Sequence, residues 1–334
     1  MDMSARQLYT DALVWDSHAG FELNSERDLE TLSIWRDAGV DFLSVNVGYD
    51  VWSWQRTIKA LALAISWLDK HKDFQIIGTV DELDRARSAG QMAVAFDIEG
   101  MNALDGSVEM VDIYHRLGVR QMLFAYNLNN QAGGGCHDED LGLTAFGKSV
   151  IASMNRVGML IDCSHTGYRS TMEAMEASTD PVVFSHSNAR KMWDHQRNIT
   201  DEQAMACAGG GGVVGVNGIG IFVGDNDIST PSIVNHIVYY LDLIGSEHVG
   251  IGLDYFADMG DVGDLNTTLS NNEDFWPKSQ YPAGGVRCAK PEQLVEIAEN
   301  LLKRGCDYSE IQGVLGGNFR RVAAEVWKNP RESR

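Results

Sequence analysis

Eight short runs of apolar residues recur along the chain, and segments with helical spacing separate them. The runs are nearly continuous in Val, Ile, Leu, Phe and Ala, which is typical of strands buried on both faces of a parallel sheet. They span residues 12–18, 40–48, 92–100, 119–127, 158–165, 181–187, 212–219 and 249–256. Amphipathic segments such as 144–157, 170–178 and 229–245 lie between them. Eight β/α repeats predict an α/β fold, a TIM-type (β/α)8 barrel formed as one domain over residues 1–334.

An open, doubly wound sheet is the alternative architecture. No Gly-x-Gly-x-x-Gly follows the first run, so a dinucleotide fingerprint is absent. The glycine run 209–212 precedes an apolar run, which favours a helix-to-strand turn over a phosphate-binding loop. Segments 291–305 and 308–327 predict extra C-terminal helices outside the barrel, and the polar, Gly-rich segment 258–287 predicts a long loop near its mouth.

Seven of the eight runs end in a polar or ionisable residue, and only the run that ends near Asn217 is less informative. The carboxyl ends of barrel strands open into one mouth, where catalytic groups collect. A single His at a strand end is more often a hydrogen-bonded structural residue, but five ionisable groups on five strand ends favour a divalent metal. The seven residues are His18, Asn46, Glu99, Tyr126, His165, His186 and Asp254.

Composition narrows the function classes. The formal net charge of −20 argues against nucleic acid and anionic membranes as partners. The five cysteines are scattered and lack Cys-x-x-Cys spacing, as expected of reduced thiols in a cytoplasm. Neither a signal peptide nor an apolar run of about 18 residues is recognisable, so the sequence predicts a cytoplasmic protein. Trp and Tyr residues at 53–55 and 238–243 are available for a homodimer, although aromatic residues at helical spacing more often belong to the core.

At these strand ends the sequence resembles the membrane (renal-type) dipeptidases, metallopeptidases of the amidohydrolase superfamily. The resemblance covers nearly the whole chain. Its most specific stretches are LTAFGKSVIASMNRVGMLIDCSHTG and PVVFSHSNAR, and RNITDEQ, HVGIGLDY and GGNFRRV add to it.

The resemblance implies a binuclear zinc site in this chain. Glu99 matches the carboxylate that bridges both metals, His165 and His186 match two ligands of one metal, and His18 matches the first ligand of the other. Asp254 matches the residue that transfers the proton during metal-assisted hydrolysis of an amide. Arg197 matches the arginine that pairs with the substrate carboxylate, a task suited to a guanidinium.

Two positions depart from the family pattern. Gly20 stands where the family has an Asp ligand, so the second metal is expected to bind weakly, unless Glu22 reaches back. Tyr126 stands where the family has a His that stabilises the oxyanion, and a phenol can also donate that hydrogen bond.

The favoured hypothesis is therefore a divergent zinc hydrolase. It would cleave a dipeptide or small amide with a free carboxylate, using one or two Zn²⁺ ions and Asp254 as general acid and base. The alternative is a catalytically altered or silent family member that binds a small carboxylated ligand through Arg197. A third hypothesis is a metal-free isomerase or lyase on the same barrel.

Overall fold

The computed structural model describes residues 4–256, 268–269, 271–281 and 285–327. Within these residues, every pair of neighbouring strands runs parallel. The main sheet has eight strands in the order β10-β1-β2-β4-β5-β6-β7, with β3 paired to β4, and β8 and β9 form a second sheet. The strands are β1 (Trp15–Gly20), β2 (Phe42–Tyr49), β3 (Phe74–Ile76), β4 (Met92–Glu99), β5 (Val119–Leu123), β6 (Leu160–Asp162), β7 (Val182–Val183), β8 (Val214–Val216), β9 (Val249–Ile251) and β10 (Tyr255–Phe256).

The two sheets join into a barrel. On one side, Phe184 after β7 forms a parallel bridge with Val214 of β8. On the other side, the backbone N–H of Asp254 donates to the carbonyl oxygen of His18 in β1 at 3.1 Å. The barrel therefore contains each of the eight predicted apolar runs, and β3 is an additional short strand. The prediction of a TIM-type fold is confirmed.

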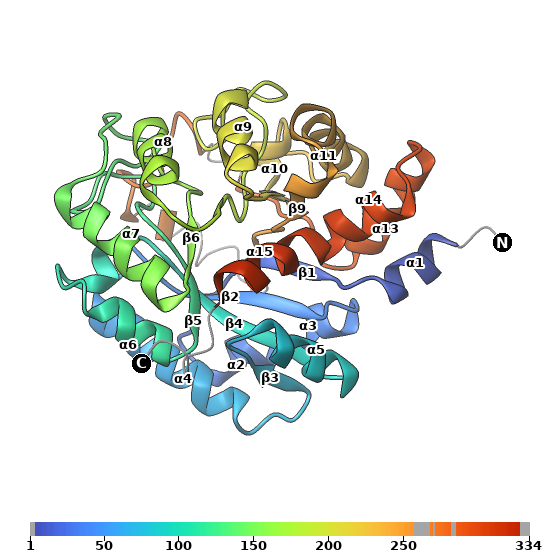
Figure 1. Cartoon of the computed structure of the whole chain (residues 1–334), viewed down its shortest axis with the longest axis horizontal. Coiled ribbons are helices and arrows are strands. Elements are labelled where there is room, and N and C mark those ends of the chain that lie inside the picture. The colour runs from blue at the N-terminus through green and yellow to red at the C-terminus, as the bar shows by residue number, and fades with distance from the viewer. Residues whose placement is uncertain (1–3, 257–267, 270, 282–284, 328–334) are drawn as a thin grey trace.

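Helices surround the strands (Figure 1). The α-helices of the described residues are α1 (Ala5–Asp11), α2 (Glu26–Glu30), α3 (Ser33–Asp37), α4 (Trp54–Leu68), α5 (Val80–Ser88), α6 (Met110–Arg116), α7 (Ala145–Val157), α8 (Tyr168–Ala177), α9 (Asp201–Gly209), α10 (Gly220–Val223), α11 (Thr230–Ile244), α13 (Gln293–Lys303), α14 (Tyr308–Gln312) and α15 (Asn318–Val326). At the ends of several of these helices, the residues are of types that cap helices. In α7, for example, the Thr144 side chain caps the first turn, and Gly158, at φ +79°, ends the helix.

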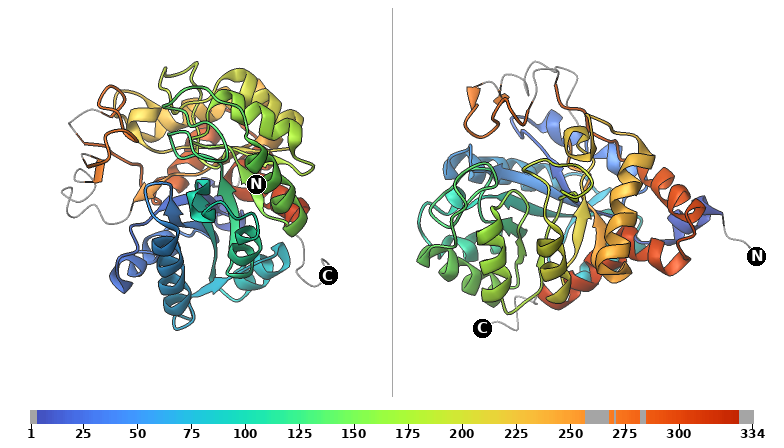
Figure 2. Two further views of the ribbon diagram at one scale, coloured as in Figure 1. Left: turned by 90° about the vertical axis from the view of Figure 1, so that its left-hand side faces the viewer. Right: turned by 90° about the horizontal axis from the view of Figure 1, so that it is seen from above.

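The sequence predictions for the connecting segments hold with one difference where the structure describes these segments. Glycines 209–212 lie between α9 and β8, as expected for a helix-to-strand turn. The C-terminal segment 308–327 is not one helix, because a π-helical turn, Gly313–Gly317, separates α14 from α15. The predicted mouth loop 258–287 lies partly outside the described residues, and Figure 2 shows its described part 271–281 at the edge of the molecule.

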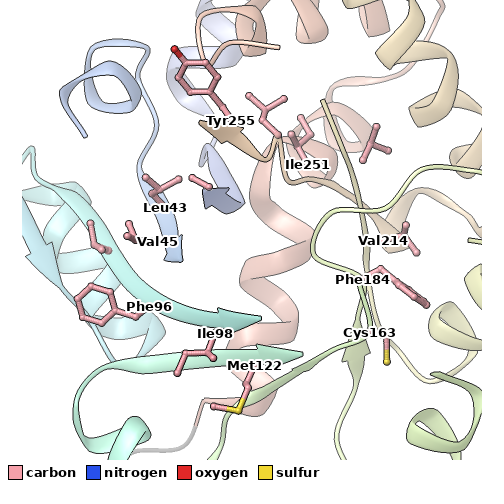
Figure 3. Packing of buried hydrophobic residues seen from close by; sticks show 14 of the residues in the cluster. Leu43, Val45, Phe96, Ile98, Met122, Cys163, Phe184, Val214, Ile251 and Tyr255 are labelled. Atoms are coloured by element: carbon pink, nitrogen blue, oxygen red, sulfur yellow. The ribbon is translucent and has the colours of Figure 1, made fainter. Parts of the chain in front are cut away.

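Alternation along the strands separates an apolar exterior from a polar interior. In β2, Leu43, Val45 and Val47 are fully buried in the main hydrophobic cluster, which also contains helix residues. Figure 3 shows part of this cluster, including Phe96 and Ile98 of β4. Since successive side chains of a strand point to opposite faces, the residues between these face the barrel interior. They are polar toward the carboxyl ends of both strands, and they are Ser44, Asn46, Asp97 and Glu99.

A second cluster closes the opposite end of the barrel. Trp15 and Phe42, near the amino ends of their strands, are in contact, with ring centroids 3.7 Å apart and ring planes tilted by 30°. Phe319 of α15 and Trp327 cover them, with ring centroids 6.2 and 5.5 Å from that of Trp15. The interior-facing polar residues named above lie at the other end of the barrel, in the mouth formed by the carboxyl ends of the strands. Among the helices described here, none is both long and apolar enough to cross a bilayer.

Candidate metal centre

The structure brings together five of the residues singled out in the sequence. His18 lies in β1 and Glu99 ends β4, while His165 and His186 each follow a strand by three residues. Asp254 lies between β9 and β10. All five side chains are buried, at no more than 7% exposure. His165 and Asp254 adopt left-handed φ values of +60° and +56°, a conformation that costs a non-glycine residue about 1–3 kcal/mol and that is concentrated at functional sites.

Three imidazoles surround one carboxylate oxygen. Oε1 of Glu99 lies 3.6 Å from Nε2 of His18, 3.3 Å from Nε2 of His165 and 3.4 Å from Nε2 of His186. Nε2 of His165 and Nε2 of His186 are 3.0 Å apart. The buried Glu99 Oε1 has no hydrogen-bond partner among the described residues. Four potential ligand atoms therefore surround one point, where Nε2 of His165 and Nε2 of His186 contact each other and Oε1 of Glu99 has no partner.

Each imidazole is oriented from behind through its other nitrogen. Nδ1 of His18 lies 3.2 Å from Oδ1 of Asp97, and Nδ1 of His165 lies 2.7 Å from Oδ1 of Asn127. Nδ1 of His186 lies 2.6 Å from Oγ of Ser185. At His165 and His186, acceptors at Nδ1 place the proton there and leave the Nε2 lone pair directed at Glu99, which is the usual arrangement of histidines that bind a metal.

Further buried acids hold these partners in place. Ser44 Oγ and Asn46 Nδ2 donate to the two carboxylate oxygens of Asp97 at 2.7 and 2.9 Å. Ser185 Oγ donates to Asp162, which also accepts two backbone N–H groups, so the serine oxygen is free to accept from His186. The sequence analysis missed Asp97, Asn127, Asp162 and Ser185. The available signal was a charged residue inside an otherwise apolar run, as in AFDIE and LIDCS.

Burial sets the protonation of the centre. Burial lowers the pKa of His165 and His186 well below the usual value, which keeps both imidazoles neutral. Burial raises the pKa of Glu99 to about 8. Burial also opposes protonation of His18, but the nearby carboxylates of Asp97 and Glu99 outweigh it and raise its pKa well above the usual value. Neutral imidazoles and a carboxylate that burial destabilises are groups that a bound cation would satisfy.

The donor spacing fits a metal of the size of zinc. In a tetrahedral site with bonds of about 2.1 Å, neighbouring ligand atoms are about 3.4 Å apart, close to the separations around Glu99 Oε1. Ligand atoms of His18, Glu99 and His186 also lie within 4.8 Å of one another. Imidazole nitrogen with carboxylate oxygen suits zinc. Three of the four donors suffice for a catalytic site and leave a further position for water.

Asp254 borders this centre without joining the cluster of imidazoles. Its Oδ1 lies 3.5 Å from Nε2 of His18, and its Oδ2 accepts a hydrogen bond from Nδ2 of Asn217 at 2.9 Å. Burial raises the pKa of Asp254 above its usual range. Asn217, the least informative strand end in the sequence, thus orients this carboxylate.

The departure at the first strand, Gly20, has a structural counterpart. A Cβ built on Gly20 would overlap Cδ1 and Cε1 of Phe256, the residue that pairs with Gly20 across β1 and β10. Glu22 does not lie within the cluster, because its Oε2 forms an ion pair with Arg56 at 3.0 Å. The aromatic ring therefore takes the space of a side chain at position 20.

A cavity of about 410 Å³ opens onto the centre. Tyr126 lies at its base, with its ring stacked on His165 at a centroid separation of 4.2 Å. Its hydroxyl oxygen accepts a hydrogen bond from Nε1 of Trp276 at 3.3 Å. Burial raises the pKa of Tyr126 well above its usual value, so the phenol keeps its proton for donation.

Arg197 lies in a second cavity of about 220 Å³ that shares His165 with the first. Its side chain is 2% exposed, and one terminal nitrogen donates to the carbonyl oxygen of His186 at 3.0 Å. Its Nε has no hydrogen-bond partner among the described residues. A buried guanidinium with an unused donor beside the centre is a site for an anion.

Asp50 connects three strand ends beneath the cavity. It accepts hydrogen bonds from the backbone N–H groups of Asn102 and Tyr126 at 2.9 and 3.1 Å, and from Nδ2 of Asn130 at 2.7 Å. Asp50→Ala would leave these donors unsatisfied in the interior, so we expect the free energy of unfolding to fall by about 3 kcal/mol or more. Urea denaturation measures this loss. Asp112→Ala is the control, because it removes a surface ion pair with Arg156 and should cost about 1 kcal/mol or less; an equal effect of both variants would contradict the assignment.

Comparison with known proteins identifies proteins that are similar to this chain in sequence and proteins that are similar to it in fold. Residues 4–271 match the family model described as membrane dipeptidase, peptidase family M19. An uncharacterized dipeptidase of Schizosaccharomyces pombe is 33% identical over 77% of this chain and 58% of its own length. Dipeptidase 3 of Rattus norvegicus is 31% identical over 74% of this chain and 48% of its own length. The chain spans about half the length of these curated relatives.

A Klebsiella pneumoniae protein encoded 5' of pqqA is 33% identical over 74% of this chain and 87% of its own length. Among solved structures, an amidohydrolase from Pseudomonas aeruginosa superposes with a TM-score of 0.89 at 25% identity, covering 97% of this chain and 99% of the other. A metallopeptidase from Rhodobacter sphaeroides, solved with a phosphinate mimic of L-Ala-D-Ala, superposes with a TM-score of 0.78 at 18% identity. The superposition covers 95% of this chain and 100% of the other, and it supports the fold.

Proposed function

Because the chain belongs to the membrane dipeptidase family, peptidase family M19, we propose that it is a zinc-dependent hydrolase of small amides that carry a free carboxylate. The observation that supports this proposal most directly is the convergence of three Nε2 atoms on the unpaired Oε1 of Glu99. In a purely structural cluster this buried carboxylate oxygen would instead accept a hydrogen bond from a protein donor.

In this proposal Glu99, His165 and His186 hold one zinc ion, and His18 is a fourth donor within reach. When bound, zinc supplies Lewis acidity, which activates water and polarises the carbonyl group of the substrate. One firmly held ion is favoured over two because position 20 offers no ligand and Glu22 is paired with Arg56.

The other residues have roles in positioning and proton transfer. Arg197 would bind the substrate carboxylate through two parallel hydrogen bonds. Asp254 would accept a proton from water as its oxygen adds to the acyl carbon, and would return that proton to the amine nitrogen as the C–N bond breaks. Tyr126 would donate a hydrogen bond to the oxygen on which negative charge develops.

Chelation and zinc restoration test the proposal. The purified protein is treated with a chelator, dialysed and supplied with increasing zinc, and a panel of dipeptides and N-acyl amino acids is assayed by amine release. We expect hydrolysis of at least one compound to disappear on chelation and to return with zinc. Full activity in the chelated protein would favour metal-free chemistry, and binding of panel members without hydrolysis at any zinc concentration would favour a silent binding protein.

A further inference from the structure

The first cavity has an apolar wall on the side of β1 and β10. His18 and Gly20 are two residues apart in one strand, so they face the same side. At Gly20 this side presents no side chain of its own, and Phe256 takes the space. Phe21, Ile219 and Trp276 line the cavity together with Phe256. The wall beside the centre is therefore aromatic and aliphatic where a side chain from β1 would otherwise project.

The acidic residues of the cavity are already engaged. Glu99 and Asp254 belong to the centre. At the rim, Glu22 is paired with Arg56 at 3.0 Å, and Asp28 accepts the backbone N–H groups of Asn24 and Ser25 at 2.7 and 2.9 Å. Among the described residues that line the cavity, no further carboxylate is present. The wall itself, formed by Phe21, Ile219 and Phe256, therefore offers a cationic group no carboxylate.

This arrangement affects which groups can bind on the acyl side of an amide substrate. In a dipeptide, the free ammonium is attached to the carbon next to the scissile carbonyl, so it must lie close to the centre. A Cβ at Gly20 would overlap Cδ1 and Cε1 of Phe256, so the ring fills this space. The ring offers an ammonium neither a hydrogen-bond acceptor nor a carboxylate. Burying an ammonium there without a partner is unfavourable.

We propose that this site selects N-acyl amino acids whose acyl group carries no α-ammonium, and that Phe256, fitted against Gly20, determines this selectivity. The inference rests on the proposed hydrolase function and narrows its substrate class. An uncharged, apolar acyl chain would pack against the aromatic wall, while the carboxylate of the amino acid part would remain with Arg197.

A pair of compounds that differ only in the ammonium group tests this proposal. N-(3-phenylpropanoyl)-L-alanine is L-phenylalanyl-L-alanine without its α-ammonium. We expect the zinc-loaded protein to hydrolyse the acyl compound with a kcat/KM on the order of 100-fold higher. A higher kcat/KM for the dipeptide would overturn this inference and leave the hydrolase function intact. Hydrolysis of neither compound, nor of any panel member, would overturn the proposed function and this inference with it.

Variants at Phe256 assign the selectivity to its ring. Phe256→Ala removes the ring, so the preference for the acyl compound should fall at least about 10-fold, mainly through a higher KM for that compound. Val286→Ala trims another apolar residue of the same cavity and should leave the ratio of the two kcat/KM values unchanged. Phe256→Gln, which keeps more of the side-chain volume and adds an amide, serves if Phe256→Ala does not fold, and an unchanged ratio in the folded variant would overturn the role of Phe256.

Discussion

Asp254→Asn is expected to lower kcat about 10²–10⁴-fold, the range for loss of a general acid and base, while zinc content stays unchanged. The amide keeps the size of the side chain but cannot accept the proton that water must release. Asp254 is separate from the proposed zinc ligands, with its nearest imidazole nitrogen, Nε2 of His18, at 3.5 Å. Single-turnover rates and zinc analysis of the same preparation measure both quantities.

Asp105→Asn is the matched control for this variant. Asp105 is also an aspartate with a left-handed backbone, at φ +47°, but it is exposed and does not line either cavity beside the centre. It should keep kcat and zinc content. If Asp254→Asn instead lost zinc together with activity, Asp254 would be a ligand and its role in proton transfer would have to be abandoned.

Glu99→Gln is expected to abolish firm zinc binding. Losing a group that merely orients a metal ligand already costs about 10–100-fold in metal affinity, so losing the shared carboxylate oxygen should cost more than about 100-fold. Three imidazole nitrogens would remain, but the negative charge that offsets the cation would be gone. Competition with a chromogenic chelator measures the affinity, and activity at limiting zinc should fall in parallel.

Glu22→Gln is the matched control for Glu99→Gln. Glu22 lines the same cavity, but its carboxylate is directed to Arg56. We expect the zinc affinity of this variant to match that of the unaltered protein. A loss comparable to that of Glu99→Gln would show that Glu22 replaces the ligand missing at position 20.

The barrel and the composition of its mouth were predictable from the sequence. Strands buried on both faces produce continuous apolar runs, and the residues at their carboxyl ends must meet in one mouth. His18, Glu99, His165, His186 and Asp254 could therefore be assigned to one mouth without any knowledge of distances.

The partners behind the imidazoles could not be predicted in the same way. Asp97 contacts His18 across 79 positions of sequence, and Asn127 contacts His165 across 38. Such contacts depend on strand register, which an apolar run does not specify. The same limit applies at Gly20, where the sequence indicates only a missing ligand, whereas the pairing of β1 with β10 brings Phe256 into its place.

The position of Arg197 also required the structure. Its motif predicts a contact with a substrate carboxylate, but the side chain lies in the second cavity, beyond His165 from the larger one. His165 lines both cavities, so it is shared by the cavity of the proposed carboxylate site at Arg197 and the cavity of the proposed acyl site at Phe256.

An anomalous-difference map from crystals of the zinc-loaded protein, recorded at the zinc absorption edge, tests the metal centre most directly. We predict one strong peak at bonding distance, about 2.0–2.2 Å, from Oε1 of Glu99 and from Nε2 of His165 and His186. A zinc-loaded crystal with no peak between these three atoms, or with its strongest peak elsewhere, would contradict the account.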